Sequence, residues 1–471
     1  MLFNSIPFLI FFPIVTLLFY LLPHKYRWIH LLAASCFFYM FFVPKYILIL
    51  LITIVIDYAA GIYIEKTVGK RKKIFLIVSI VSTCLVLVIF KYLDFFNNNV
   101  IALSHYFGFS YPDRVFNIIL PIGLSFHTFQ SLSYVIEVYR GNQKAERHFG
   151  IYSLYVMFYP QLVTGPIERP QNLLRQLNEK KTFQLNNVIR GVRLILFGLF
   201  VKMVIADNLA VYVDQIYENP EIYSTLSILT ALLFYSFQIY CDFFGYSTIA
   251  LGCALTMGYF ITENFKTPYL SKNITEFWHR WHISLSSWFR DYVYFPMGGS
   301  RVKTPRWVFN IAFVFMLSGF WHGANWTFIL WGAAYSVFYL LEHVCRKNIK
   351  LDFSKNIFIH NILNILLIVK NFIVVTLIWV FFRSVNTGQI AVVYRSIISN
   401  FHVKDDFFVD HKIWGFLLLF VLFDFVLRKS RFDTWCGERS FIVRWSIYAL
   451  LLFLILAFSS VNSFPFIYFQ F

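Results

Sequence analysis

Apolar runs of nearly membrane-spanning length recur from one end of this sequence to the other. A helix needs about 20 consecutive apolar residues to cross the hydrocarbon core of a bilayer, and inside lipid its backbone polar groups satisfy one another. The runs predict an all-α polytopic membrane protein with about ten to thirteen passes. They cover approximately residues 4–22, 28–43, 46–63, 74–95, 117–139, 151–164, 188–206, 224–259, 307–320, 326–344, 361–383, 413–427 and 443–461.

The composition agrees with this prediction. Hydrophobic residues make up 59% of the chain and charged residues only 14%, whereas soluble domains carry about 25% charged residues. No polar stretch is long enough for a separate soluble domain, and no internal repeat suggests the duplicated halves of a transporter. We therefore expect a single integral-membrane domain over residues 1–471.

The loops between the runs differ in their content of basic residues. Lys and Arg concentrate at residues 23–27, 66–73 and 140–148, whereas the loops after the second and fourth runs carry one basic residue each. The positive-inside rule therefore predicts that these three loops are cytoplasmic and that the N-terminus lies outside. The first run has no basic residue ahead of it and no small-residue cleavage site after it, which indicates a retained helix rather than a signal peptide.

The formal net charge of +17 raises the alternative of a nucleic-acid-binding protein. The basic residues lie in short loops between apolar runs rather than on one soluble face. Membrane topology and contact with anionic lipid explain this charge better, so we expect membrane lipids and no nucleic acid as partners.

Two regions depart from the pattern of apolar spans and basic loops. In the first, "LPIGLSFHTFQSLSYVIEVYRG" carries polar residues through an otherwise spanning segment, and Pro160, Gly165 and Pro166 break the next segment, "FYPQLVTGPIERP". Helices broken at membrane depth are tolerated only where the freed backbone groups face protein or a wet cavity. These segments are expected to line an internal space.

The second region extends from about residue 235 to residue 331. Between Asn273 and Gly299, charged residues alternate with tryptophan, phenylalanine and tyrosine. This mixture is typical of an amphipathic or re-entrant helix pair at the membrane interface, where aromatic rings lie level with the headgroups. The "PMGGSR" that follows predicts a turn.

His279 and His282 lie three residues apart, which predicts one shared helical face and a spacing that metals use. A supporting Cys, Asp or Glu ligand is missing at a suitable interval, and both histidines have tryptophan neighbours. We therefore expect no bound metal, with a metal site as the alternative.

His322, in "LSGFWHGANW", is a polar residue inside an apolar region, where an unpaired polar group is costly. A histidine that hydrogen-bonds between packed helices remains one interpretation. The functional alternative gains support because Ser318 and Asn325 can supply partners, while Gly319 and Gly323 let another helix or a thin substrate come close. A neutral imidazole, whose pKa is ordinarily about 6.5, can take a proton from a hydroxyl group, as hydroxyl acylation requires.

Three segments together resemble the membrane-bound O-acyltransferase family, and within it the bacterial alginate O-acetyltransferase type. They are "QIYCDFFGYSTIALG", "NITEFWHRWHISLSSWFRDYVYFPMGGSR" and "FWHGANW", in this order and spacing, and "FYPQLVTGPIERP" and the closing "PFIYFQF" extend the resemblance over nearly the whole chain. The resemblance implies a ring of helices around a thinned centre, with re-entrant helices and a funnel and tunnel that lead to one histidine. It also implies a catalytic core at about residues 117–345.

The same resemblance implies roles for individual residues. His322 corresponds to the near-invariant histidine and would act as the base, with Gly319 and Gly323 keeping space for a flat acyl group. His282 corresponds to the second polar motif position and would orient the acyl group or stabilise the oxyanion. Residues expected to line the tunnel or support the site are Asp242, Trp278, Arg280, Trp288, Arg290, Asp291, Ser318 and Asn325.

The implied activity is acetyl transfer from a cytoplasmic thioester, acetyl-CoA or an acyl carrier, to hydroxyl groups of an extracytoplasmic polysaccharide. Transfer would occur in the bacterial inner membrane, directly or through a periplasmic acetyl-carrying or esterase-like partner, with no bound cofactor. Related branches leave two alternatives open: D-alanyl transfer to teichoic acid and O-acetylation of peptidoglycan. A transporter and an assembly subunit without chemistry are the alternatives from other classes.

Overall fold

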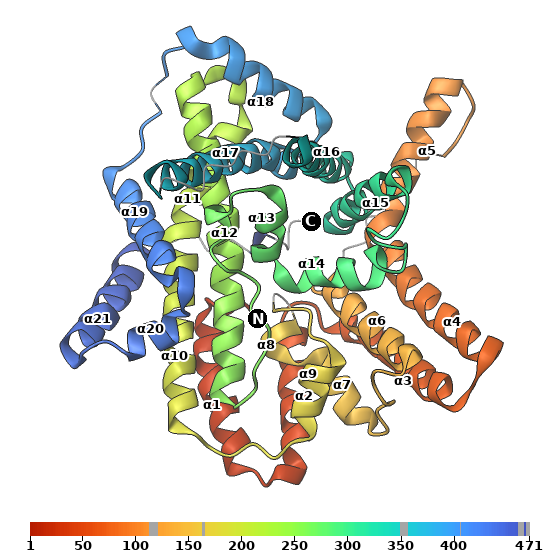
Figure 1. Cartoon of the computed structure of the whole chain (residues 1–471). Coiled ribbons are helices and arrows are strands. Elements are labelled where there is room, and N and C mark those ends of the chain that lie inside the picture. The colour runs from red at the N-terminus through yellow and green to blue at the C-terminus, as the bar shows by residue number, and fades with distance from the viewer. Residues whose placement is uncertain (113–120, 163–164, 349–356, 406, 460–465, 468–471) are drawn as a thin grey trace. The chain divides into compact units, whose positions relative to one another are not determined.

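The computed structural model describes residues 1–112, 121–162, 165–348, 357–405, 407–459 and 466–467. Throughout these ranges the regular secondary structure is helical, with no β-strand (Figure 1). The chain divides into two compact units: Met1–Ile195 with Ile249–Thr262, and Leu196–Thr248 with Glu263–Phe471. Helices α10 (Leu185–Phe200) and α12 (Thr225–Thr256) contribute residues to both.

Seven helical segments of the described chain are long and apolar enough to cross a membrane. Helix α1 (Ile6–Leu21) is also apolar, but it is shorter than these seven segments. Large apolar side chains such as Ile77, Val81 and Leu85 are exposed on these segments, as expected of surfaces that face lipid. The chain is therefore an all-α, multi-pass membrane protein. The seven segments are Pro44–Lys66, Gly69–Phe107, Leu185–Glu218, Thr225–Thr256, Trp326–Arg346, Phe358–Arg383 and Phe441–Phe458.

The first unit contains α1 and eight further helices that lie wholly within it. Buried Asp57 of α3 accepts hydrogen bonds from Ser79 (2.6 Å) and Thr83 (3.0 Å) of α4, which satisfies a carboxyl group within apolar helices. The eight helices are α2 (His24–Met40), α3 (Ile47–Lys66), α4 (Gly69–Leu87), α5 (Leu93–Phe107), α6 (Leu124–Arg140), α7 (Phe149–Met157), α8 (Tyr159–Leu162) and α9 (Pro170–Asn178).

The predicted break near Pro160 is confirmed. Helix α7 ends at Met157 and the four-residue helix α8 ends at Leu162, so the run at 151–164 is interrupted. Residues 165–169 are not helical before α9 begins at Pro170. The preceding polar segment forms α6. The residue before this helix, Gly123, has a left-handed backbone conformation (φ 77°). The expected beginning of that run, at residues 117–120, lies outside the described residues.

The second unit carries the region rich in charged and aromatic residues. In Figure 1 the short green helices α13 (Ile274–Arg280) and α14 (Ile283–Phe289) follow α12. The other helices of this unit are α11 (Asp207–Glu218), α15 (Thr304–His322), α16 (Trp326–Asn348), α17 (Ile357–Arg383), α18 (Thr387–Ser399), α19 (His411–Val426), α20 (Phe432–Gly437) and α21 (Phe441–Phe458).

The predicted pair of helices between Asn273 and Gly299 is therefore present, and the predicted turn follows it. Gly298 (φ 100°) and Gly299 (φ 57°) adopt positive φ angles in that turn, which glycine does at little cost. The prediction that His279 and His282 share one helical face is wrong. Helix α13 ends at Arg280, and His282 has left-handed backbone angles (φ 43°, ψ 54°) at the start of α14.

Helices α15 and α16 pack against each other at a very short distance. A Cβ atom on Gly319 of α15 would lie 2.1 Å from the carbonyl oxygen of Phe328 on α16. A Cβ atom on Gly332 of α16 would lie 2.2 Å from the carbonyl oxygen of Phe315 on α15. No side chain fits at either position, so these glycines fix how closely the two helices approach.

Candidate active site

His322 is the last residue of α15 and is only 4% exposed. Its imidazole ring meets Trp331 of α16 at 5.2 Å between ring centroids, with an interplanar angle of 83°. Phe382 of α17 contacts it at 5.3 Å and the adjacent Trp321 at 4.9 Å. These edge-on contacts from three helices fix the ring in a largely apolar enclosure, which we call the His322 cage.

A second layer of aromatic side chains supports the cage. Trp331 contacts Trp278 of α13 at 5.7 Å and Trp379 of α17 at 6.0 Å. Trp278 also packs edge-on against Tyr335 of α16 at 5.0 Å. The structure thus places Trp278 behind the ring that touches His322, where it positions the cage.

His282 lies between α13 and α14 and is 1% exposed. Its ring contacts Phe243 of α12 edge-on at 4.6 Å and Trp321 at 6.5 Å. Trp321 therefore contacts both His282 and His322. His282 lies outside the candidate membrane-spanning segments, and burial lowers its pKa to about 3, so its imidazole is neutral near pH 7.

Asn264 fastens the junction that carries His282. The Ser284 hydroxyl donates to Asn264 Oδ1 (2.6 Å), and the Ile283 amide donates to the Asn264 carbonyl oxygen (2.9 Å). The Lys266 amide also donates to the Arg280 carbonyl oxygen (3.0 Å). These bonds offset the roughly 1–2 kcal/mol that a left-handed residue with a Cβ atom costs. Sequence reasoning missed Asn264, because its partners are some twenty residues away.

Asp242, next to Phe243 on α12, belongs to a buried charge network. Its Oδ1 lies 2.5 Å from Lys202 Nζ, and Lys202 Nζ lies 2.7 Å from Asp207 Oδ1. The Ile467 amide donates to Asp242 Oδ2 (2.7 Å). The network therefore joins residues 202–207, α12 and the described part of the C-terminal segment, next to the phenylalanine that packs on His282.

Sequence reasoning also missed Lys202. Its signal was a lysine inside the apolar run at 188–206, where an ionisable residue implies a buried partner. The lysine lies in a stretch of π-helix, Val201–Ala206, between α10 and α11. A Cβ atom on Gly245 of α12 would lie 3.0 Å from the Lys202 amide nitrogen. This close approach lets the buried charges pair, which offsets the high cost of their desolvation.

The motif residues around α14 make local contacts of their own. Arg280 forms an ion pair with Glu276 one turn earlier (2.6 Å). Trp288 is buried and packs against Tyr292 at 5.2 Å. Arg290 pairs with the adjacent Asp291 (2.9 Å) at a partly exposed position. These contacts lie within α13, α14 and the residues directly after α14.

A cavity of about 420 Å³ brings three of the predicted residues together. Trp278, Arg290 and Ser318 line it, and Ser318 lies one helical turn before His322. His279 lines the same cavity, whereas His282 packs on Phe243. The two histidines thus face different surroundings. Among the described residues, no cluster of three or more His, Cys, Asp or Glu side chains is arranged to hold a metal ion.

Asn325 stabilises the turn between α15 and α16. Its Nδ2 donates to the Val385 carbonyl oxygen (2.8 Å), and its Oδ1 accepts a hydrogen bond from the Thr327 amide (3.1 Å). Both contacts are with backbone groups, so Asn325 holds the helix that begins directly after the His322 segment.

The expectation that Gly319 and Gly323 keep space for an acyl group is wrong. A Cβ atom on Gly323 would lie 2.1 Å from the ring of Phe328, and the space beside Gly319 is taken by the backbone of α16. The sequence also allowed a second interpretation, in which these glycines let another helix come close. The structure shows this second arrangement, with α16 as the neighbouring helix.

Comparison with known proteins identifies the family. Residues 148–384, which include both histidines, match MBOAT, the membrane-bound O-acyltransferase family. The probable alginate O-acetylase AlgI of Pseudomonas aeruginosa is 36% identical over 405 residues, covering 85% of this chain and 75% of that protein. The peptidoglycan O-acetyltransferase of Helicobacter pylori is 35% identical over 402 residues (78% and 73%).

A more distant relative matches a shorter part of the chain. The teichoic acid D-alanyltransferase of Bacillus subtilis is 33% identical over 235 residues, or 47% of this chain and 58% of that protein. Together with the helical fold and the two buried histidines, these matches show that the chain is an O-acyltransferase. It belongs to the membrane-bound O-acyltransferase family.

Proposed function

We propose that this protein transfers an acetyl group from a cytoplasmic thioester, acetyl-CoA or an acyl carrier, to hydroxyl groups of an extracytoplasmic, alginate-like polysaccharide. The observation that carries the proposal is the buried His322 in its cage, within the region that matches the acyltransferase family. The name of the Pseudomonas relative supports acetyl as the group and a polysaccharide as the acceptor. We place the enzyme in the bacterial inner membrane with its N-terminus outside, on the evidence of the basic loops.

In the proposed mechanism, His322 acts as general base. One imidazole nitrogen takes the proton of the acceptor hydroxyl while the hydroxyl oxygen attacks the thioester carbonyl carbon. The new C–O bond forms and the C–S bond breaks, and the leaving thiolate recovers the proton from the imidazolium. The reaction needs no ATP, because cleavage of the thioester drives it.

His282 would stabilise the oxyanion that forms during the attack. Burial keeps this imidazole neutral, so it would act through an N–H donor rather than as a cation. A preorganised donor of this kind contributes about 2.7–4 kcal/mol to the stability of the transition state. The contact of Trp321 with both histidines supports a joint role in one site.

O-acetylation of peptidoglycan is the second candidate. The Helicobacter relative, which carries that name, covers 78% of this chain at nearly the same identity as the alginate-type relative. D-alanyl transfer to teichoic acid has weaker support, because the Bacillus relative covers only 47% of the chain. In each case the acceptor could receive its group directly or through a periplasmic acetyl-carrying or esterase-like partner.

His322→Gln tests the proposed function directly. Glutamine keeps a polar side chain of similar length but cannot act as a base, so we expect acetyl transfer to fall at least about 100-fold. The measurement is transfer of labelled acetyl groups to polysaccharide by the full-length protein in membranes. His343→Gln is the matched control, because His343 is exposed on α16 and lies outside the cage.

Both variants should insert into membranes and elute as monodisperse protein in detergent, since glutamine is close to histidine in size and leaves little empty space at either position. Near-normal acetylation by His322→Gln would refute the assignment of the base. It would then favour an assembly subunit without chemistry.

A further inference from the structure

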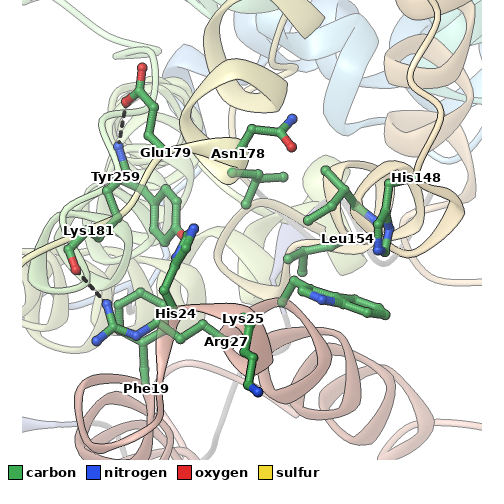
Figure 2. Close-up of a pocket in the computed structure, with 13 residues that line it drawn as sticks. Phe19, His24, Lys25, Arg27, His148, Leu154, Asn178, Glu179, Lys181 and Tyr259 are labelled. Atoms are coloured by element: carbon green, nitrogen blue, oxygen red, sulfur yellow. Dashed lines mark hydrogen bonds and ion pairs between the residues drawn. The ribbon is translucent and has the colours of Figure 1, made fainter.

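The first unit contains a pocket of about 290 Å³ that the proposed mechanism does not use (Figure 2). Four separate segments form it: the end of α1 with the first turns of α2, the start of α7, the end of α9 with the residues after it, and the loop that contains Tyr259. We call it the α2–α7 pocket. Its inner wall is apolar and includes the buried side chains of Phe19, Leu154 and Leu177.

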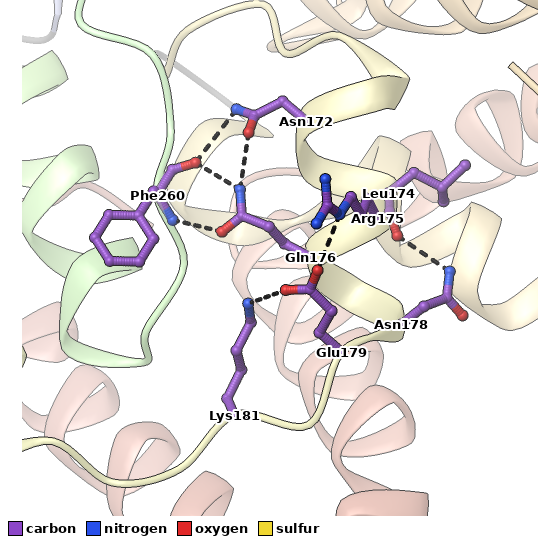
Figure 3. Close-up of polar contacts among 8 residues, drawn as sticks. All are labelled: Asn172, Leu174, Arg175, Gln176, Asn178, Glu179, Lys181 and Phe260. Carbon is purple, nitrogen blue, oxygen red and sulfur yellow. Dashed lines mark hydrogen bonds and ion pairs between the residues drawn. The ribbon is translucent and has the colours of Figure 1, made fainter.

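Hydrogen bonds hold the separate segments of the wall in fixed positions. The Gln176 side chain makes a pair of bonds with the Phe260 backbone, each 2.8 Å long, and Asn172 Nδ2 also donates to the Phe260 carbonyl oxygen (Figure 3). These bonds fasten the Tyr259 loop to α9. The pocket is therefore a preformed feature of this unit and does not depend on a single loop.

Arg27 fastens the opposite side of the pocket. Its Nε donates to the Leu22 carbonyl oxygen (2.9 Å), and its Nη1 donates to the carbonyl oxygen of Lys181. The guanidinium also lies over the Phe19 ring at 4.9 Å. Because backbone and aromatic contacts hold it, this permanent positive charge stays at the wall of the pocket.

The charges that line the pocket are predominantly positive. Lys25, Arg27 and Lys181 line it together with one carboxylate, Glu179. Glu179 is shared between Lys181 Nζ and Arg175 Nε, each at 3.1 Å. The Lys181 ammonium lowers the pKa of the Glu179 carboxyl, so the carboxylate is ionised and still leaves an excess of positive charge.

Two further features favour an anion. His148 Nδ1 accepts a hydrogen bond from the Ile151 amide (3.1 Å), so the neutral ring carries its proton on Nε2 and can donate to a ligand. The pocket also lies at the N-terminal turns of α2 and α7, where the helix dipole is positive. The C-terminal end of α9 opposes this effect, but Lys181 lies beside that end and offsets it.

We propose that the α2–α7 pocket binds a phosphate group carried by a ligand with an apolar or aromatic portion. The lysines, with His148, match the negative charge and the acceptor oxygens of a phosphate. Trp28, Tyr259 and the apolar wall match the rest of the ligand. An anionic phospholipid and a soluble phosphate share this chemistry, and two arms of the experiment distinguish them.

The test compares the full-length wild-type protein with Lys25→Gln/Lys181→Gln in zwitterionic detergent. One arm titrates phosphatidylglycerol and the other inorganic pyrophosphate, and native mass spectrometry counts the bound probe. We expect the wild type to retain one tightly bound probe and the double variant to bind it at least about tenfold more weakly. Lys70→Gln/Lys73→Gln is the matched control, because it removes the same charge from exposed positions in the first turns of α4, which do not line the pocket.

Lys25→Arg/Lys181→Arg should restore binding, which separates loss of charge from disturbed folding. Binding of phosphatidylglycerol alone would identify a lipid headgroup, and binding of pyrophosphate would show that the phosphate group suffices. The proposal is overturned if the wild type binds neither probe. It is equally overturned if Lys25→Gln/Lys181→Gln binds like the wild type or no more weakly than Lys70→Gln/Lys73→Gln.

Discussion

The left-handed backbone at His282 decides which substitutions there are informative. At φ 43°, the left-handed conformation costs a residue with a Cβ atom about 1–2 kcal/mol of stability. Asparagine adopts this conformation more readily than most other residues do. Asparagine also keeps an N–H donor, whereas alanine keeps the strain and loses the donor. A comparison of the two variants therefore separates the backbone effect from the chemical role.

We predict that His282→Ala lowers kcat by about 100- to 1,000-fold, as expected for the loss of one oxyanion donor. His282→Asn should recover part of this activity, and His279→Ala should cost much less, because His279 lines the cavity instead. The measurement is kcat and KM for each purified variant. Equal losses in His279→Ala and His282→Ala that added zinc restores would support the metal alternative instead.

At the scale of single residues, the sequence predicted most where a polar residue stood out within an apolar run. His322 was found in this way, whereas Asp242 was indicated by the family resemblance, and the structure buries both. Lys202 gave the same signal but was overlooked, although it pairs with Asp242. Asn264 gave no local signal, because its role depends on hydrogen bonds to residues 283 and 284, which lie beyond α13 in the sequence.

The sequence predicted helical elements better than their ends. The aromatic and charged pattern between Asn273 and Gly299 predicted two helices, and α13 and α14 confirm them. Periodicity alone did not show that α13 ends at Arg280. That end depends on backbone bonds from residues 264–266, which hold the chain in a turn between the helices.

The close packing of α15 and α16 leads to a prediction about Gly319. A methyl group in Gly319→Ala would lie 2.1 Å from the Phe328 carbonyl oxygen, so the helices must separate. We expect a loss of about 1–3 kcal/mol in stability and a fall in activity of up to about 100-fold, because His322 lies one turn later on α15. Thermal unfolding and initial rates measure the two effects.

Gly415→Ala on α19 is the matched control for Gly319→Ala. Its added Cβ atom would have no neighbouring heavy atom within 4 Å. The higher helix propensity of alanine should make this variant neutral or up to about 1 kcal/mol more stable. If Gly319→Ala behaved like this control in stability and in rate, the close helix contact would have no part in positioning His322.

At the scale of the whole molecule, the composition predicted a multi-pass helical protein, which is confirmed. The number of crossings was less predictable. Seven described segments have the length and apolar character of a span, while several other runs form shorter helices such as α7, α8 and α19. The break near Pro160 shortens α7 and α8. An apolar run alone does not reveal whether it crosses the membrane or only enters it.

The direction of transfer is a prediction about the whole molecule. By the positive-inside rule, the basic segments at 23–27, 66–73 and 140–148 predict that those ends of the helices face the cytoplasm, where thioester donors are made. An acceptor polysaccharide outside the membrane would then meet the acetyl group at His322 from the opposite face.

We predict acetyl transfer in sealed vesicles of one orientation when acetyl-CoA is present only on the cytoplasmic side and purified acceptor, with any periplasmic partner, only on the other. Exchanging the two compartments should abolish transfer, and His322→Gln vesicles should be inactive in both arrangements. Transfer that occurs only when donor and acceptor share one compartment would refute transfer across the membrane, even with His322 essential.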